Sequence, residues 1–156
     1  MYRDEAPSTI PVDATIDALD GEFTYPLRYG YAASGVVTDV GSGVSDRWLG
    51  RTVFGFAPHQ TRFRAEPESV VPLPEGMDPE TGSLLPSVET ATNLVLDTAP
   101  RLGGRVVVLG AGVIGLCVTR LLGSFPLEEL VVVDPIEGRR DLAREMGATR
   151  IETPET

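Results

Sequence analysis

The chain has 156 residues, of which 42% are apolar and 23% are charged, and its net charge is −10. This composition is typical of a globular protein with a substantial core. All thirteen basic residues are arginine, and the acidic balance argues against nucleic acid and anionic membranes as partners. No apolar run approaches the roughly 18 residues that span a bilayer. The first residues lack the pattern of a signal peptide, so we expect a cytoplasmic protein.

The first half of the chain predicts a β-rich region. Residues 1–24 are polar and without period, so we expect a loop or extended segment there. Short apolar runs bounded by Gly and Pro then predict four strands: Ala33 to Val40, Arg51 to Ala57, Thr61 to Ala65 and Ser69 to Leu73.

Two helices are predicted next. Asp78-Pro79-Glu80 combines an N-cap residue, a proline at the first helical position and an acid in the first turn. Apolar residues at helical spacing predict a second helix over Val88 to Ala99.

A strand and a glycine loop follow. Val106 to Leu109 is an unbroken apolar run, typical of a buried parallel strand. Gly110, Gly112 and Gly115 then fill a G-x-G-x-x-G frame, which allows a sharp turn, close approach of a pyrophosphate and tight helix packing. The helix that begins at Val113 and Ile114 would direct unpaired N–H groups at the phosphates.

A second apolar run, Leu130 to Val133, ends in Asp134, which lies 19 residues after Gly115. A carboxylate at this spacing is expected to accept hydrogen bonds from an adenosine ribose. It repels a 2′-phosphate, so NAD is predicted rather than NADP, although Arg139 and Arg140 follow closely and soften that preference. The alternative is a plain βαβ crossover with tight turns, which leaves the acid unexplained.

The end of the chain continues the α/β pattern. A helix is predicted from Ile136 to Met146, with Gly147 at its C-terminus, and Arg150-Ile151 begins a third strand. Right-handed crossovers place both cofactor-segment helices on one face of the sheet. The helix at Val88 to Ala99 is the candidate to shield part of the other face. Cys117 falls among apolar helix residues, so we interpret it as a core residue.

The order of these motifs resembles the medium-chain dehydrogenase/reductase superfamily, which includes the zinc-type alcohol dehydrogenases. The motifs that carry the resemblance are Tyr25 to Val37, Val40 to Val44, Gly50 to Phe54, Pro72 to Met77 and Glu89 to Ala91. The resemblance implies an α/β fold with a partial GroES-like domain over 1–86. A connecting helix and turn over 87–104 and a partial NAD-binding Rossmann domain over 105–156 follow. It also implies that the chain is incomplete at both ends, lacking the region where strand order reverses.

The sequence departs from the zinc-type members of that family. Where those members carry a zinc-ligating histidine and a glutamate, this chain has Tyr31 and Ala32, and their cysteine position falls near Pro86 or Ser87. Zinc needs three or four thiolate, imidazole or carboxylate ligands, so we expect no zinc. Tyr31 and the segment around His59 resemble a zinc-ligand-poor branch that includes bacteriochlorophyllide dehydrogenases.

The resemblance implies hydride transfer between a nicotinamide coenzyme and a small alcohol, carbonyl or enone. Tyr31 and His59 are candidates for handling the proton, against ordinary packing for Tyr31 and a surface position for His59. Thr90 is a candidate to lie near the nicotinamide, against a role in starting the helix.

Three functional hypotheses remain open. The first is a zinc-independent oxidoreductase with a small-molecule substrate, represented in part and inactive alone. The second is a non-catalytic nucleotide-binding remnant or a subunit that a second chain completes. The third is a protein that binds FAD or S-adenosylmethionine. The expected partners are a copy of the chain in a homo-oligomer or a completing chain.

Overall fold

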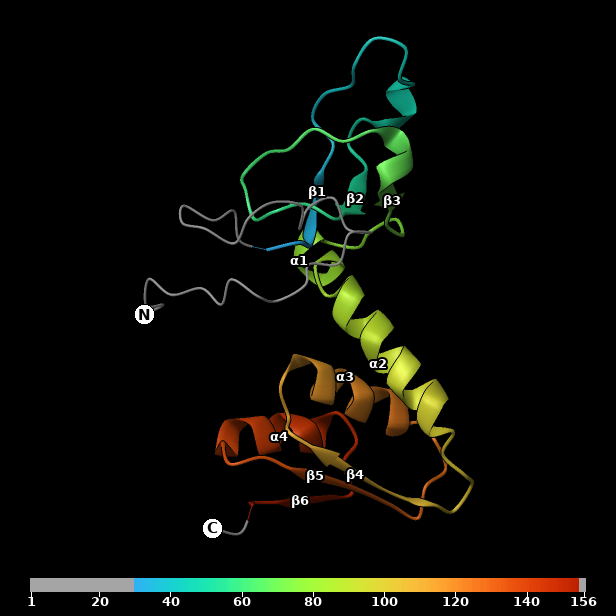
Figure 1. Ribbon diagram of the computed structural model, residues 1–156, viewed down its shortest axis with the longest axis vertical. Helices are drawn as coiled ribbons and strands as arrows, with labels where there is room; N and C mark the ends of the chain where they lie inside the picture. The colour runs from blue at the N-terminus through green and yellow to red at the C-terminus, as the bar shows by residue number, and fades with distance from the viewer. Residues whose placement is uncertain (1–29, 155–156) are drawn as a thin grey trace, which may run out of the picture. The chain divides into compact units, whose positions relative to one another are not determined.

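The computed structural model describes residues 30–154, which divide into two compact units between Leu84 and Leu85 (Figure 1). The predicted loop over residues 1–24 lies outside the described residues. The helix that the sequence assigns to a connection between two domains, α2 (Leu85–Thr98), packs within the second unit, against helix α3 (Val113–Leu122).

The first unit contains a three-stranded antiparallel sheet with the order β1-β2-β3. Val53 and Phe54 of the central strand are buried, at 6% and 3% exposure. The three strands are β1 (Ala33–Val36), β2 (Thr52–Gly55) and β3 (Val70–Pro72). They are shorter than predicted, because each strand extends only over the residues that pair with a neighbouring strand.

One predicted strand of the first unit is wrong. The segment from Thr61 to Ala65 is a loop in the structure, and both edges of β2 are already paired with β1 and β3. Its alternating arginines, Arg62 and Arg64, are exposed. The segment pairs with neither outer edge of this sheet, and an alternating pattern without a pairing partner does not make a strand.

Short helices complete the first unit. The helix start predicted at Asp78 is confirmed: α1 (Pro79–Gly82) begins there, and the Asp78 carboxylate accepts a 2.8 Å bond from the Thr81 N–H. This bond satisfies one of the unpaired donors of the first turn. Two 3-10 turns, η2 (Asp46–Trp48) and η3 (Pro67–Ser69), lie between the strands.

The second unit is built on a parallel sheet with the order β4-β5-β6. The predicted strands are confirmed as β4 (Arg105–Leu109), β5 (Glu129–Val133) and β6 (Arg150–Glu152). Strand β5 is central, and its residues Leu130, Val131 and Val132 are at most 5% exposed.

Helices α3 (Val113–Leu122) and α4 (Glu137–Glu145) lie on the same side of this sheet (Figure 1), as the handedness of the crossovers requires. The core between helices and sheet consists of small side chains around Val132, which is fully buried with Ala111 and Ala143. Small residues let the helices approach the strands closely. Gly147, which follows α4, has a φ of +115°, as expected at a helix C-terminus.

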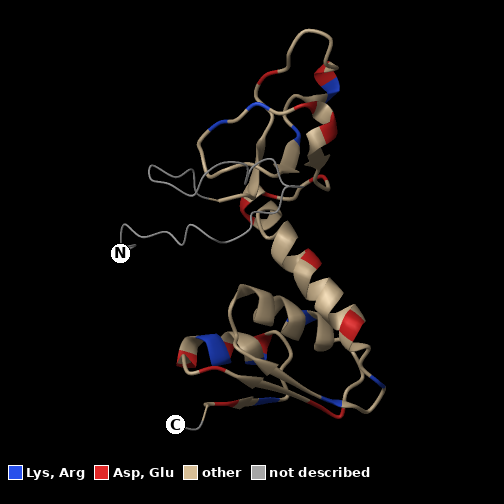
Figure 2. Cartoon of the chain, viewed as in Figure 1, with Lys and Arg blue, Asp and Glu red and all other residues tan. Residues whose placement is uncertain are grey.

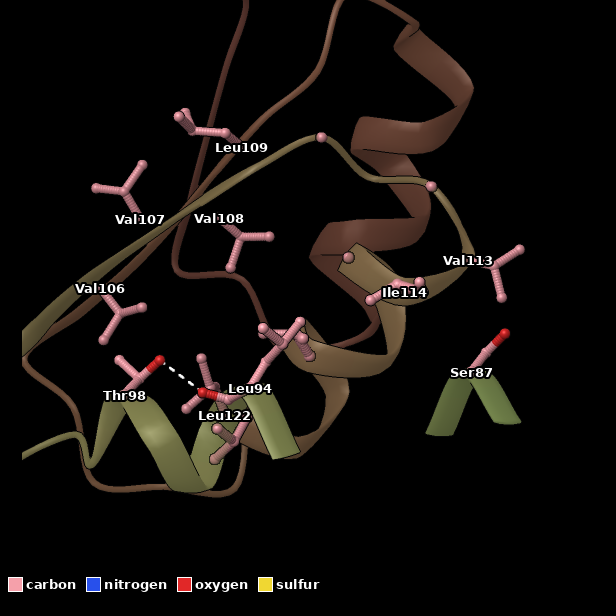
Figure 3. Close-up of a pocket in the computed structure, with 15 residues that line it drawn as sticks. Ser87, Leu94, Thr98, Val106, Val107, Val108, Leu109, Val113, Ile114 and Leu122 are labelled. Atoms are coloured by element: carbon pink, nitrogen blue, oxygen red, sulfur yellow. Dashed lines mark hydrogen bonds between the residues drawn. The ribbon is translucent and has the colours of Figure 1, made fainter. Parts of the chain in front are cut away.

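Helix α2 (Leu85–Thr98) begins about one turn earlier than predicted and packs against α3. The expectation that it shields the other face of the sheet is wrong. Val107 and Leu109, which point away from the helices (Figure 3), are 58% and 81% exposed. Helix α2 therefore packs on the same side of the sheet that α3 already covers.

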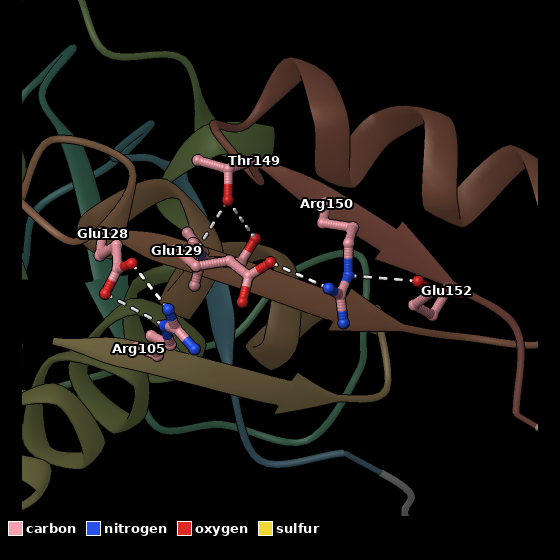
Figure 4. A network of polar contacts seen from close by, with 7 residues as sticks. Arg105, Glu128, Glu129, Thr149, Arg150 and Glu152 are labelled. Carbon is pink, nitrogen blue, oxygen red and sulfur yellow. Dashed lines mark hydrogen bonds and ion pairs between the residues drawn. The ribbon is translucent and has the colours of Figure 1, made fainter.

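Polar side chains tie the sheet together near the starts of its strands (Figure 4). Thr149 Oγ1 accepts a 2.8 Å bond from the Leu130 N–H and donates a 3.1 Å bond to its carbonyl oxygen. Arg105 forms a two-pronged contact with Glu128, at 2.7 and 3.1 Å.

The helices within residues 30–154 include none with the length and apolar character that a membrane span requires.

Candidate functional site

The glycine loop joins the end of β4 to the start of α3. Gly110 has a φ of +94°, a left-handed conformation that favours glycine, and its N–H donates a 2.8 Å bond to the Val133 carbonyl oxygen. The turn therefore stays attached to the neighbouring strand while the chain reverses into the helix.

Gly112 and Gly115, the other two glycines of the motif, are required for different structural reasons. A methyl group on Gly115 would collide with the carbonyl oxygen of Gly110, so α3 can approach the loop only without a side chain there. A methyl group on Gly112, the N-cap of α3, would meet no atom within 4 Å. The loop is therefore closed on the side of Gly115 and open on the side of Gly112.

The open side presents hydrogen-bond donors. Val113 and Ile114 start α3, so their N–H groups have no carbonyl within the helix to bond. The positive end of the helix dipole adds to these donors. These two residues are 53% and 41% exposed. An anionic group can thus reach the backbone here, which fits a pyrophosphate.

Beside the loop lies a cavity of about 660 Å³ between α2, β4 and α3 (Figure 3). Its walls are mostly apolar, from Val106 and Val108 of the strand to Leu94 and Leu122 of the two helices. Glycine-loop backbone forms one end. The cavity offers an apolar surface next to a cluster of backbone donors, a combination common in cofactor sites.

Helix α2 contributes Ser87 and Thr98 to this cavity rather than the predicted Thr90. The Thr90 hydroxyl donates a 2.9 Å bond to the Pro86 carbonyl oxygen within the helix, and its residue is exposed. Sequence reasoning did not identify Ser87 as a lining residue. The spacing of Ser87, Leu94 and Thr98, seven and four residues apart, places them on one helical face and could have indicated it.

Asp134 lies at the end of β5 and is only 2% exposed. Its Oδ2 accepts a 2.8 Å bond from the Ala111 N–H, in the middle of the glycine loop, and its Oδ1 accepts a 2.8 Å bond from the Ile136 N–H. Both carboxylate oxygens thus already have a backbone donor. Each retains one lone pair, so the predicted ribose contact stays a prediction.

These bonds set the charge state of Asp134. The Ile136 and Ala111 N–H groups hold the pKa of the carboxyl below its usual value, and the guanidinium groups of Arg139 and Arg140 act in the same direction against the effect of burial. The side chain is therefore ionised at neutral pH, and the loop is tied to β5 by a charged acceptor.

Two arginines of α4 lie beside this carboxylate but differ in their contacts. Arg140 Nη1 donates a 2.8 Å bond to the Asp134 carbonyl oxygen. Arg139 Nη1 lies 3.8 Å from Asp134 Oδ2, and its side chain is 50% exposed. Arg140 therefore holds the backbone, whereas Arg139 lies between the carboxylate and solvent.

The remaining candidates, Tyr31 and His59, lie in the first unit. The Tyr31 ring stacks on Phe56 with centroids 6.4 Å apart and is 45% exposed. The His59 ring packs against Gly30, where a methyl group would collide with it. The structure thus places His59 beside the residue that precedes Tyr31. Among residues 30–154 no group of three His, Cys, Asp or Glu side chains is arranged to hold a metal ion.

No protein-family model matches the chain. Among curated relatives, it is 31% identical over 90 residues to an Escherichia coli protein described as an uncharacterized zinc-type alcohol dehydrogenase-like protein, covering 57% of this chain and 26% of that one. It is 27% identical over 157 residues to D-xylulose reductase of Saccharomyces cerevisiae, covering 81% of this chain and 44% of the relative. The chain therefore spans less than half of either relative.

Solved structures show the same fold. The quinone oxidoreductase of Escherichia coli, complexed with NADPH, matches with a TM-score of 0.66 at 20% identity, covering 86% of this chain and 43% of that one. Solved neighbours include complexes with NADH and with NADPH. The fold is thus that of a GroES-like unit followed by a Rossmann-type unit, as the sequence predicted.

A first prediction concerns the contact between Gly115 and the loop. Gly115→Ala places a methyl group against the Gly110 carbonyl oxygen, and we expect a loss of about 1–3 kcal/mol in the free energy of unfolding from such overpacking. Urea denaturation followed by circular dichroism measures it. Gly112→Ala is the matched control, since its methyl group meets open space. Equal stability of the two variants would contradict the close approach.

A second prediction concerns the stability of the protein at low pH. Because the folded pKa of Asp134 is lowered, its contribution to stability is present above the unfolded carboxyl pKa of about 3.9 and is lost as pH falls through the lower folded value. Asp134→Asn should lower stability at pH 7, because an amide cannot accept from both N–H groups. The difference between wild type and variant should shrink below about pH 4. Unfolding curves from pH 7 to pH 2 measure this, and a pH-independent difference would contradict it.

Proposed function

Because the chain's sequence and structural neighbours are members of the zinc-type alcohol dehydrogenase-like, medium-chain dehydrogenase/reductase family, we propose that it binds a nicotinamide dinucleotide and belongs to an oxidoreductase. The observation that carries this proposal is the glycine loop, closed at Gly115 and open at Gly112 beside the start of α3. NAD is the proposed coenzyme, since the carboxylate of Asp134 disfavours a 2′-phosphate.

In this proposal the chain's own residues bind and orient the coenzyme. The N–H groups of Val113, Ile114 and the loop hold the pyrophosphate, and Asp134 holds the loop through Ala111. The apolar wall of the cavity excludes water from one side. When bound, the coenzyme supplies hydride transfer. Tyr31 or His59 is the proposed group that exchanges the proton of an alcohol, carbonyl or enone substrate.

The coenzyme proposal is tested by binding. The fluorescence of NADH should rise on titration with the protein, and Gly112→Ala should weaken its binding at least about tenfold, because the methyl group takes the space of the phosphates. The stability of this variant should match wild type, since nothing lies within 4 Å of the added methyl group. Unchanged NADH binding by a folded Gly112→Ala protein would overturn the proposal.

We also propose that the reaction needs no zinc. The support is the donor set: Tyr31 and Ala32 stand where zinc-type relatives carry ligands, and the described residues offer no cluster of three ligand side chains. Metal analysis of the purified protein should find substoichiometric zinc, and a chelator should leave NADH binding unchanged. One bound zinc ion per chain would overturn this part of the proposal.

We also propose a second candidate function, because one edge of the sheet in the second unit is unpaired among the described residues. The outer edge of β4 is unpaired among the described residues, and Val107 and Leu109 are exposed beside it. This favours a nucleotide-binding subunit that further polypeptide completes, or a fragment inactive alone. Turnover assays with alcohols, aldehydes and enones test whether the chain acts alone: turnover would contradict both the incomplete subunit and the inactive fragment, and NADH binding without turnover would agree with either.

A further inference from the structure

Strand β4 has a free edge with backbone groups that are directed outward. Among the described residues it pairs with β5 alone, at one side of the sheet. The Gly110 N–H, just after the strand, bonds to the Val133 carbonyl oxygen of β5. Because the direction of the backbone groups alternates along a strand, the N–H and C=O groups of Arg105, Val107 and Leu109 are directed at the free edge. These groups are available to a further strand.

The side chains along this edge are apolar on both faces of the sheet. Val107 and Leu109 lie on the face without helices and are 58% and 81% exposed (Figure 3). Val106 and Val108 lie on the helix face and line the cavity of about 660 Å³. Val107 and Leu109 line the same cavity, so it extends to the edge of the strand. A strand added at this edge therefore needs apolar side chains on both of its faces.

The opposite edge of the same sheet is different. Strand β6 has three residues, and its exposed Arg150 and Glu152 form an ion pair at 3.2 Å. Short strands with charged side chains are a common protection against edge-to-edge association. Strand β4 has a single charge, that of Arg105 at its start, which is paired with Glu128 at 2.7 Å. In the described part of this sheet, the β4 edge is thus the one that is open to association.

The sequence contains a strand that fits this edge. The chain has two runs of four consecutive apolar residues, Val106 to Leu109 and Leu130 to Val133. The second run belongs to β5, which is already paired on both sides. The first run belongs to β4 itself, and it is apolar on both faces, as a covered strand requires. The matching strand that this protein offers is therefore the β4 of a second copy.

We propose that two copies of the chain associate by antiparallel pairing of their β4 strands about a two-fold axis at Val107. Val107 then lies opposite the partner's Val107, and Arg105 lies opposite the partner's Leu109. In this register all three outward-directed residues exchange backbone hydrogen bonds with outward-directed residues. The two Arg105 side chains are separated by four residues of strand, about 14 Å, so like charges do not meet.

The proposed pairing also limits the size of the assembly. Each copy uses its β4 edge once, and the charged edge at β6 opposes further addition, so association closes at a dimer. The partner's strand closes the cavity where it reaches the edge of β4. This inference goes beyond the proposed coenzyme site and does not depend on it.

The test places charges on the two-fold axis. Sedimentation equilibrium of the full chain should show a monomer–dimer equilibrium. Val107→Lys and Val107→Glu each place two like charges directly opposite one another, and each should weaken the dimer at least about tenfold. An equimolar mixture of the two variants should associate again, because opposite charges then face each other.

A matched control carries the same charge elsewhere. Leu142→Lys adds a lysine at a residue of α4 that is 44% exposed, away from β4, and it should leave the dimerisation constant unchanged. Circular dichroism shows which variants are folded. Association in the mixture, absent from either variant alone, supports the proposal and cannot result from unfolding.

The remaining outcomes overturn the proposal. A wild-type chain that stays monomeric overturns it, as does a dimer that Val107→Lys does not weaken. Loss of the dimer in both variants without recovery in the mixture contradicts the two-fold pairing. A monomer that instead binds a separate apolar strand at β4 overturns it and leaves the second proposed function standing. NADH titration is a separate readout: a monomer that binds NADH leaves the coenzyme proposal intact, and a dimer that binds none leaves this inference intact.

Discussion

One buried carboxylate connects the parts of the second unit on which its function depends. Asp134 accepts N–H bonds from Ala111 in the glycine loop and from Ile136 before α4. A buried charge is costly unless it is hydrogen-bonded, and here both of its oxygens are. The loop after β4 and the loop after β5 are therefore held at one edge of the sheet. The Gly110 N–H adds a bond from the same glycine loop to the Val133 carbonyl oxygen of β5.

The same constraint shapes what the site can bind. Because the glycine loop is bonded to β5, the start of α3 has a fixed orientation. Its unpaired N–H groups are already directed at the ligand site, so binding carries no conformational cost for ordering them. The apolar cavity along β4 and α2 begins at this point (Figure 3). A ligand with a phosphate at one end and a flat, less polar part at the other suits this combination.

Charge is distributed unevenly over this scaffold. Acidic side chains exceed basic ones by ten in the sequence, yet basic and acidic residues alternate along α4 (Figure 2). Near the end of β5, Arg139 and Arg140 approach Asp134, and Glu152 pairs opposite Val133 on the neighbouring strand. In the first unit, Tyr31 and Phe56 form an exposed aromatic pair.

The sequence by itself determined the strands β4 and β5, the glycine loop and the start of α1, because these depend on local patterns: apolar runs, glycine spacing and an N-cap. It failed at Thr61 to Ala65, since a strand needs a neighbouring strand to pair with, and this segment pairs with none of the three strands of the first unit. The position of α2 on α3 and the bonds of Asp134 also came only from the tertiary structure. Backbone N–H donors such as that of Ala111 leave no mark in the residue type, so only the folded chain decides which carboxylate they meet.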